Sequence, residues 1–104
     1  MKYILAIILT FYFWACADKV QDHTTAKIDG KHIFQKNCVL CHGSDGSLEM
    51  NGAKDLSKST ITLDQRITQI TNGKNLMTPF KGILSEKEIA AVAEYTMSLK
   101  ASEQ

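Results

Sequence analysis

A pair of cysteines followed directly by a histidine constrains this chain more than any other feature. The segment C-V-L-C-H contains Cys38, Cys41 and His42. Two thiols at this spacing can add to the two vinyl groups of one haem, while the histidine is directed at the iron. Imidazole is a strong ligand for iron, and a backbone carbonyl can orient its other ring nitrogen. The segment therefore predicts one covalently attached haem c, with His42 as an axial ligand.

Two other kinds of site use cysteines at this spacing. A structural zinc site needs four ligands, but the only other histidines are His23 and His32, and no second ligand pair exists. A thioredoxin-like dithiol belongs at the end of a strand in an α/β fold, and no β-α-β pattern surrounds Cys38. Three cysteines, two of them this close together, do not read as a disulfide framework either. Haem attachment is the stronger interpretation.

Residues 1–15 have the layout of a secretory signal peptide, with a lysine, an apolar run from Tyr3 to Trp14 and then a small residue. The run is shorter than the roughly 20 residues that a helix needs to cross a bilayer, which disfavours a permanent span. It also lacks the polar positions of a buried core helix. We therefore expect an exported protein on the periplasmic side of a bacterial membrane.

Cys16 follows Ala15, where the lipid-modified cysteine of a bacterial lipoprotein stands, so this segment resembles a lipobox. Phe13 and Trp14 depart from the usual motif. We expect a lipid anchor at Cys16, with ordinary cleavage nearby and an uncleaved anchor as the alternatives. Residues 16–28 are polar and without periodicity, which suits a tether between the anchor and a folded unit.

The folded unit is expected at residues 29–100, followed by a tail at 101–104. In a unit this small, the apolar core alone provides only marginal stability, so an additional covalent cross-link such as an attached haem is expected. Helical periodicity and the absence of a strand pattern predict an all-α domain with main helices at about 30–37, 62–72 and 85–100. Capping-box patterns begin the second and third helices. The predicted inward-facing side chains are Ile33, Phe34, Leu63, Ile67, Ile70, Ile89, Val92, Ala93, Thr96 and Leu99.

The iron of such a haem has a sixth coordination position. Either a methionine occupies it or it is an open site. Met97 lies within the third helix, where ordinary packing explains it. Met50 follows His42 too closely to reach the opposite haem face easily. Met77 lies in N-L-M-T-P-F, where Pro79 would help to fix the loop that presents the thioether. We predict Met77 as the second axial ligand, with core packing as the alternative.

With these residues in place, residues 30–100 resemble the class I cytochromes c, specifically the short bacterial monohaem type. The resemblance rests on C-V-L-C-H, on G-x-x-x-F-x-x-x-C from Gly30, and on G-K-N-L-M-T-P-F-K-G-I-L-S-E-K-E-I, which looks like the family's methionine loop. It implies the small cytochrome c fold, with three main helices wrapped around one haem. The N-terminal helix would cross the C-terminal helix near Val92 and Tyr95.

The chain departs from the family pattern in two loops. Family members commonly have a proline after the haem histidine, whose carbonyl accepts from the histidine ring, but the only proline here is Pro79. The segment Gly52–Leu56 is expected to take this place, with Leu56 as a haem-wall residue. Thr78 also separates Met77 from Pro79, where the family often has Met-Pro directly.

The resemblance implies electron transfer between redox proteins that meet an exposed haem edge transiently. If His42 and Met77 both bind iron, no site remains for substrate, so we expect a carrier and not an enzyme; methionine ligation raises the potential. The net charge of +1 and the scattered charges give no indication of nucleic-acid binding. The alternatives are a haem subunit dedicated to one oxidase, reductase or dehydrogenase, or an open-site haem enzyme or gas binder if Met77 is not a ligand.

Overall fold

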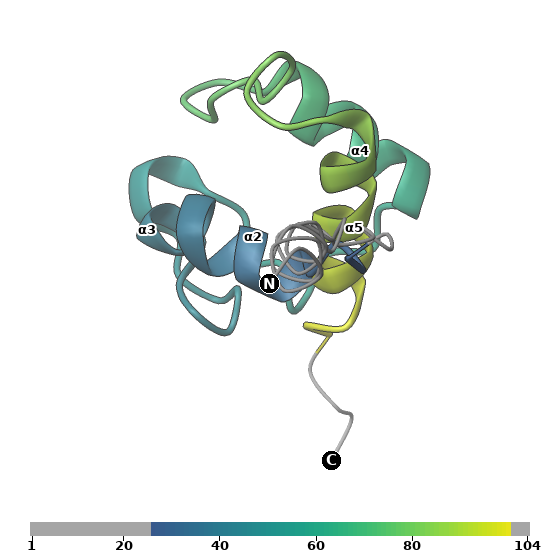
Figure 1. Cartoon of the computed structure of the whole chain (residues 1–104). Helices are drawn as coiled ribbons and strands as arrows, with labels where there is room; N and C mark the ends of the chain where they lie inside the picture. Colours follow the sequence, from purple (N-terminus) through teal and green to yellow (C-terminus); the bar gives the residue numbers. More distant parts are fainter. Residues whose placement is uncertain (1–25, 101–104) are drawn as a thin grey trace, which may run out of the picture.

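The structure is a computed structural model that describes residues 26–100; the predicted signal peptide, Cys16 and the tail lie outside the described residues. No strand occurs between residues 26 and 100, and none of the helices there is long and apolar enough to span a membrane. The prediction of an all-α domain is confirmed (Figure 1). The elements are α2 (Gly30–Asn37), α3 (Val39–His42), the 3₁₀ turn η2 (Met50–Gly52), α4 (Leu63–Asn72) and α5 (Glu86–Met97).

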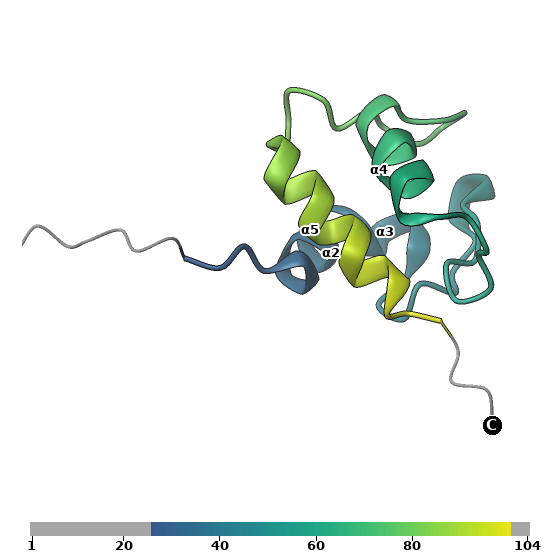
Figure 2. The same cartoon turned by 90° about the vertical axis from the view of Figure 1, so that its right-hand side faces the viewer.

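Helices α2 and α5 cross at close range, and α4 packs against α5 beside them (Figure 2). A β-carbon on Gly30 would overlap the carbonyl oxygen of Ala91 and lie 3.2 Å from Cβ of Tyr95. The rings of Phe34 and Tyr95 pack with their centroids 5.3 Å apart, a contact typically worth about 0.5–1.5 kcal/mol beyond its buried area. The predicted helix crossing is present, and the glycine permits its close approach.

Side-chain caps begin all three longer helices. Thr62 and Gln65 form a reciprocal capping box at α4, with hydrogen bonds of 2.8 and 3.2 Å. Ser85 and Glu88 form the same arrangement at α5, with bonds of 2.8 and 3.1 Å. Asp29 caps α2 by accepting from two backbone amides. Each such cap contributes about 1 kcal/mol, so these local bonds help to fix where the chain turns into helix.

The apolar core is small and lies between α2, α4 and α5. Among the predicted inward residues, Leu63, Ile67 and Leu99 are only partly buried and pack against the edge of this core. A domain with so little buried apolar surface has marginal stability of its own. The buried apolar residues are Ile33, Phe34, Ile70, Ile89, Val92 and Ala93.

The predicted third helix extends too far, because α5 ends at Met97 and not at Lys100. The backbone amides of Ser98 and Leu99 donate to the carbonyls of Tyr95 and Thr96 over 3.0 and 3.3 Å. These bonds to residues three positions earlier tighten the last turn, as at many helix ends. The short elements α3 and η2 are too brief for periodicity to reveal.

Candidate functional site

A cavity of about 610 Å³ lies between the helices, and α2, α3, η2, α4, α5 and the intervening loops all contribute to its wall. Apolar side chains, including the predicted wall residue Leu56, form much of its lining. This volume is in the range of about 300–1,000 Å³ that is usual for small-molecule and cofactor sites. The lining apolar side chains include Phe34, Leu56, Ile70, Phe80 and Val92.

Cys38 and Cys41 both lie in the cavity wall, half-buried and as free thiols. Cys38 follows α2 and hydrogen-bonds through its amide to the carbonyl of Phe34, 2.9 Å away. Burial raises the pKa of Cys38 to about 11, so the free thiol is protonated at neutral pH. Thioredoxin-like exchange needs a thiolate with a lowered pKa, so this environment disfavours a redox dithiol.

His42 ends α3 and is held by a backbone carbonyl across the loop. Its Nδ1–H donates to the carbonyl oxygen of Lys54 over 3.0 Å. This bond leaves Nε2 unprotonated and available to a metal, which is how second-shell carbonyls orient histidine ligands. Burial lowers the pKa of His42, opposed by the smaller, raising effect of the Lys54 bond. The accepting carbonyl therefore lies within the Gly52–Leu56 segment expected to replace the family's proline.

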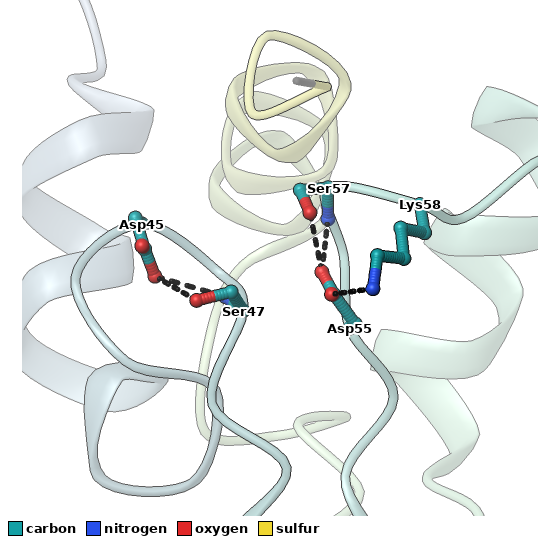
Figure 3. A network of polar contacts seen from close by, with 5 residues as sticks. All are labelled: Asp45, Ser47, Asp55, Ser57 and Lys58. Atoms are coloured by element: carbon teal, nitrogen blue, oxygen red, sulfur yellow. Dashed lines mark hydrogen bonds and ion pairs between the residues drawn. The ribbon is translucent and has the colours of Figure 1, made fainter.

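Two Asp-x-Ser turns stiffen the loop that carries Lys54 (Figure 3). Asp45 accepts from the amide and hydroxyl of Ser47 over 3.0 and 2.7 Å. Asp55 accepts from the amide of Ser57 over 2.9 Å and from its hydroxyl. These bonds lower the pKa of both aspartates. Because Asp55 directly follows Lys54, the second turn also fixes the carbonyl that holds the histidine.

A close contact at Gly46 joins the two arms of this loop. The amide of Leu56 donates to the carbonyl of Gly46 over 2.8 Å. Gly46 has φ +81°, and a β-carbon there would lie 3.0 Å from Cδ1 of Leu99 and 3.1 Å from Cβ of Leu56. A side chain at Gly46 would therefore crowd Leu56 in the cavity wall as well as Leu99.

Met77 lines the cavity from the loop after α4, and His42 lines it from α3. This loop and α3 lie on different sides of the fold (Figure 1). The Met77 amide bonds to the carbonyl of Lys74 over 2.9 Å. The amide of Phe80 bonds to Ile70 at the end of α4 over 3.0 Å. Nε2 of Gln69 lies 4.0 Å from the Met77 sulfur and donates to it. The loop is thus tied to α4 at the methionine itself, through Gln69, and after it, through Phe80.

Gly73 makes this loop possible at the end of α4. It has φ +68°, which favours glycine, and a β-carbon there would overlap the carbonyl oxygen of Met77 and lie 2.8 Å from the nitrogen of Pro79. The chain can turn back over the helix end only because this position carries no side chain.

The other two methionines differ in their relation to the cavity. Met97 does not line it, in agreement with a packing role. Met50 does line it, from η2, which packs against α3, and half of its side chain is exposed. Met50 is therefore on the His42 side of the cavity, while Met77 comes from the loop after α4.

The residues present fit a haem. The cavity wall contains two thiols, an imidazole with a free ring nitrogen, a thioether and an apolar lining. Within residues 26–100, no three histidine, cysteine or acidic side chains gather as a zinc site requires. Imidazole and thioether are ligands that suit haem iron.

Arg66 and Gln69 are cavity residues that sequence reasoning missed. Arg66 is only 3 % exposed and lines the cavity. Helical spacing from Leu63 to Ile70 places the intervening Arg66 on the same inward face. The sequence signal that could have identified Arg66 is a charged residue at an inward-facing position of the helix.

A comparison with known families matches residues 25–95 to the model described as "Cytochrome C oxidase, cbb3-type, subunit III". Cytochrome c6 of Rippkaea orientalis is 35% identical over 105 residues, covering 94% of each chain. Cytochrome c6 of Leptolyngbya boryana is 40% identical over 74 residues, covering 65% of this chain and 86% of the relative.

The fold is also similar to a solved structure, the KustC0563 c-type cytochrome. The TM-score is 0.65 at 28% sequence identity, and the match covers 70% of this chain and 99% of that one. The chain belongs to the cytochrome c family and is an electron-transfer protein with covalently bound haem c.

Proposed function

We propose that the protein is a class I, monohaem electron carrier. In this proposal Cys38 and Cys41 hold the haem through thioether bonds, and His42 and Met77 are the two axial ligands. The observation that supports it is a single cavity whose wall contains all four side chains, with the His42 ring oriented by Lys54.

A haem iron supplies a one-electron couple between its ferrous and ferric states. With His42 and Met77 in both axial positions, no coordination site would remain for substrate or dioxygen, which supports a carrier over an enzyme. The apolar wall excludes water and disfavours the extra positive charge of ferric iron. A thioether ligand acts in the same direction and raises the potential.

Exposed apolar side chains at the cavity support transient contact with redox partners. Leu76 is 78% exposed and Met50 is 50% exposed, and both belong to the cavity wall. A partner that docks over them would bring its own cofactor close to the haem edge without a deep interface. Small interfaces of this kind suit short-lived electron-transfer encounters.

The proposal places the domain on the periplasmic side of a bacterial membrane, with Cys16 as a lipid anchor. The support is the sequence of residues 1–16, in which an apolar run ends at Ala15 and Cys16. The polar stretch after Cys16 would let the domain reach partners near the membrane surface.

Haem attachment at the two cysteines is tested by denaturation in acid acetone. The wild-type polypeptide should keep its haem, whereas the double variant Cys38→Ser and Cys41→Ser should yield largely unfolded apoprotein. Cys16→Ser is the matched control, because it replaces a cysteine outside the C-V-L-C-H segment and should leave the haem attached. Free extraction of haem from the wild-type chain would refute thioether attachment.

A further inference from the structure

Arg66 is a buried cation in the wall of the haem cavity. Only 3 % of it is exposed. Its Nη1 donates to the carbonyl and the hydroxyl of Thr96 over 3.3 and 3.1 Å, and its Nη2 donates to the carbonyl of Ser59 over 3.2 Å. All three acceptors are neutral, and the buried Nε has no hydrogen-bond partner. These bonds orient the guanidinium but leave its charge unbalanced.

The described part of the chain provides no counter-ion for this charge. The one ion pair within residues 26–100 joins Lys58 to Asp55. The acidic residues of the cavity wall are Glu49 and Asp55, and neither lies within ion-pair distance of Arg66. Burial lowers the pKa of Arg66, yet a guanidinium stays protonated in proteins. Buried charges are normally paired, so Arg66 needs an anion from outside the described residues.

A haem brings two propionate carboxylates into its pocket. We propose that Arg66 is the counter-ion of one haem propionate, keeps that propionate ionised inside the cavity, and thereby sets the reduction potential and its independence of pH. This inference rests on a haem in the cavity, which acid-acetone denaturation tests separately. Arg66 would act on the cofactor through its propionate and not as a ligand of the iron.

The other cations of the cavity wall, Lys54, Lys58 and Lys74, are exposed, so water screens their charge more than that of buried Arg66. His42 is committed through Nδ1 to Lys54, and Asp55 is engaged by Ser57 and Lys58. Helix α5, which packs against α4, presents to Arg66 only the carbonyl and hydroxyl of Thr96. The ionisable side chains of the cavity wall, besides the two cysteines and Arg66, are His42, Glu49, Lys54, Asp55, Lys58 and Lys74.

The test is the midpoint potential of the holoprotein as a function of pH. The wild-type potential should stay constant from about pH 5 to pH 9, since a paired propionate remains ionised well below its ordinary carboxylic-acid pKa. In Arg66→Gln, the unpaired buried propionate should titrate within this range and take up a proton on reduction. Its potential should therefore fall as pH rises, matching wild type at low pH and lying below it at high pH.

Two variants separate this role from a purely structural one. Arg66→Lys keeps the positive charge and should keep the flat profile, even if the protein is less stable. Lys58→Gln removes an exposed cation from the cavity rim, and its solvent-screened effect on the potential should be small and independent of pH. A profile of Arg66→Gln that runs parallel to wild type would overturn the proposal.

A measurement on the wild-type protein covers the case in which Arg66→Gln does not fold. Carbon-13 resonances of the haem propionate carboxylates report their protonation directly. One propionate should show no titration down to about pH 5. Two propionates that both titrate above that pH would also contradict the pairing.

Discussion

Nδ1 of His42 donates a hydrogen bond to the carbonyl oxygen of Lys54, 3.0 Å away. The two residues belong to opposite arms of one loop, which the Asp-x-Ser turns and the bond between Leu56 and Gly46 hold closed. A backbone carbonyl from a non-proline residue therefore performs the orienting role. This bond sets the ring tautomer that leaves Nε2 free to bind iron.

The stability of the holoprotein should fall as the pH drops below about 6.5, the ordinary pKa of histidine. Burial lowers the pKa of His42, and in the proposed site a bond from Nε2 to iron would also prevent proton uptake by the ring. The unfolded chain, in which that bond is broken, takes up a proton where the folded chain does not. The contribution of His42 to the free energy of unfolding is therefore fully present above the unfolded pKa. It is lost as the pH falls towards the folded pKa, by up to about 1.4 kcal/mol per pH unit. Guanidinium unfolding midpoints between about pH 8 and pH 5 measure this loss.

His32 provides the control for this pH dependence, because it is exposed on α2. His32→Ala should leave the slope of stability against pH unchanged. If the slope disappears in His32→Ala, the pH dependence comes from His32, and the prediction for His42 is wrong.

Gly73→Ala should weaken the bond between Met77 and iron. The new β-carbon would overlap the Met77 carbonyl and crowd the nitrogen of Pro79, so the loop must shift. Binding of carbon monoxide to the ferrous protein measures the opened site. Gly82→Ala is the matched control: it has φ +81° but no atom within 4 Å of the new β-carbon. It should lose about 1–2 kcal/mol of stability from backbone strain and still exclude carbon monoxide.

Equal carbon monoxide binding by Gly73→Ala and Gly82→Ala would mean that backbone strain, and not the contact with Met77, controls the site. Exclusion of carbon monoxide by both variants would mean that the loop accommodates the extra carbon without moving its methionine.

Mass spectrometry of the mature protein should show an N-terminal cysteine at position 16 that carries a diacylglyceryl group. Lipid chains hold a protein at a membrane, and two bind firmly where one binds only marginally. Cys16→Ser should release the domain or block its processing. An unmodified N-terminus downstream of Cys16 would rule the anchor out and leave a soluble exported carrier.

The main helices were predictable because their signals are local. The capping pairs Thr62 with Gln65 and Ser85 with Glu88 mark two helix starts in the sequence, and both boxes are present. The end of α5 was not predictable from periodicity, because the bonds that tighten its last turn follow from the backbone geometry around Ser98.

The cavity was only partly predictable, because its composition depends on contacts between distant segments. The cysteines, His42 and Met77 are found from their motifs and loop. The identity of the carbonyl that holds His42, that of Lys54, depends on how two turns fold against each other. The role of Arg66 depends on its burial between Ser59 and Thr96. Spacing in the sequence contains neither relationship.

Met77→Ala should leave the haem attached, because Cys38 and Cys41 are unchanged, but should open the iron to water or carbon monoxide. The potential should fall, since thioether sulfur favours ferrous iron more than water does. Met50→Leu and Met97→Leu are the controls, and Met50 is the stricter one because it also lines the cavity. Both controls should keep the wild-type spectrum and potential.

The most direct measurement of the central claim is the near-infrared spectrum of the ferric protein. Ligation of iron by a methionine gives a weak charge-transfer band in this region. We predict that wild type, Met50→Leu and Met97→Leu all show the band and that Met77→Ala lacks it. A band that survives in Met77→Ala and disappears in one of the other two variants, or a wild-type protein without the band, would contradict an electron carrier ligated by His42 and Met77.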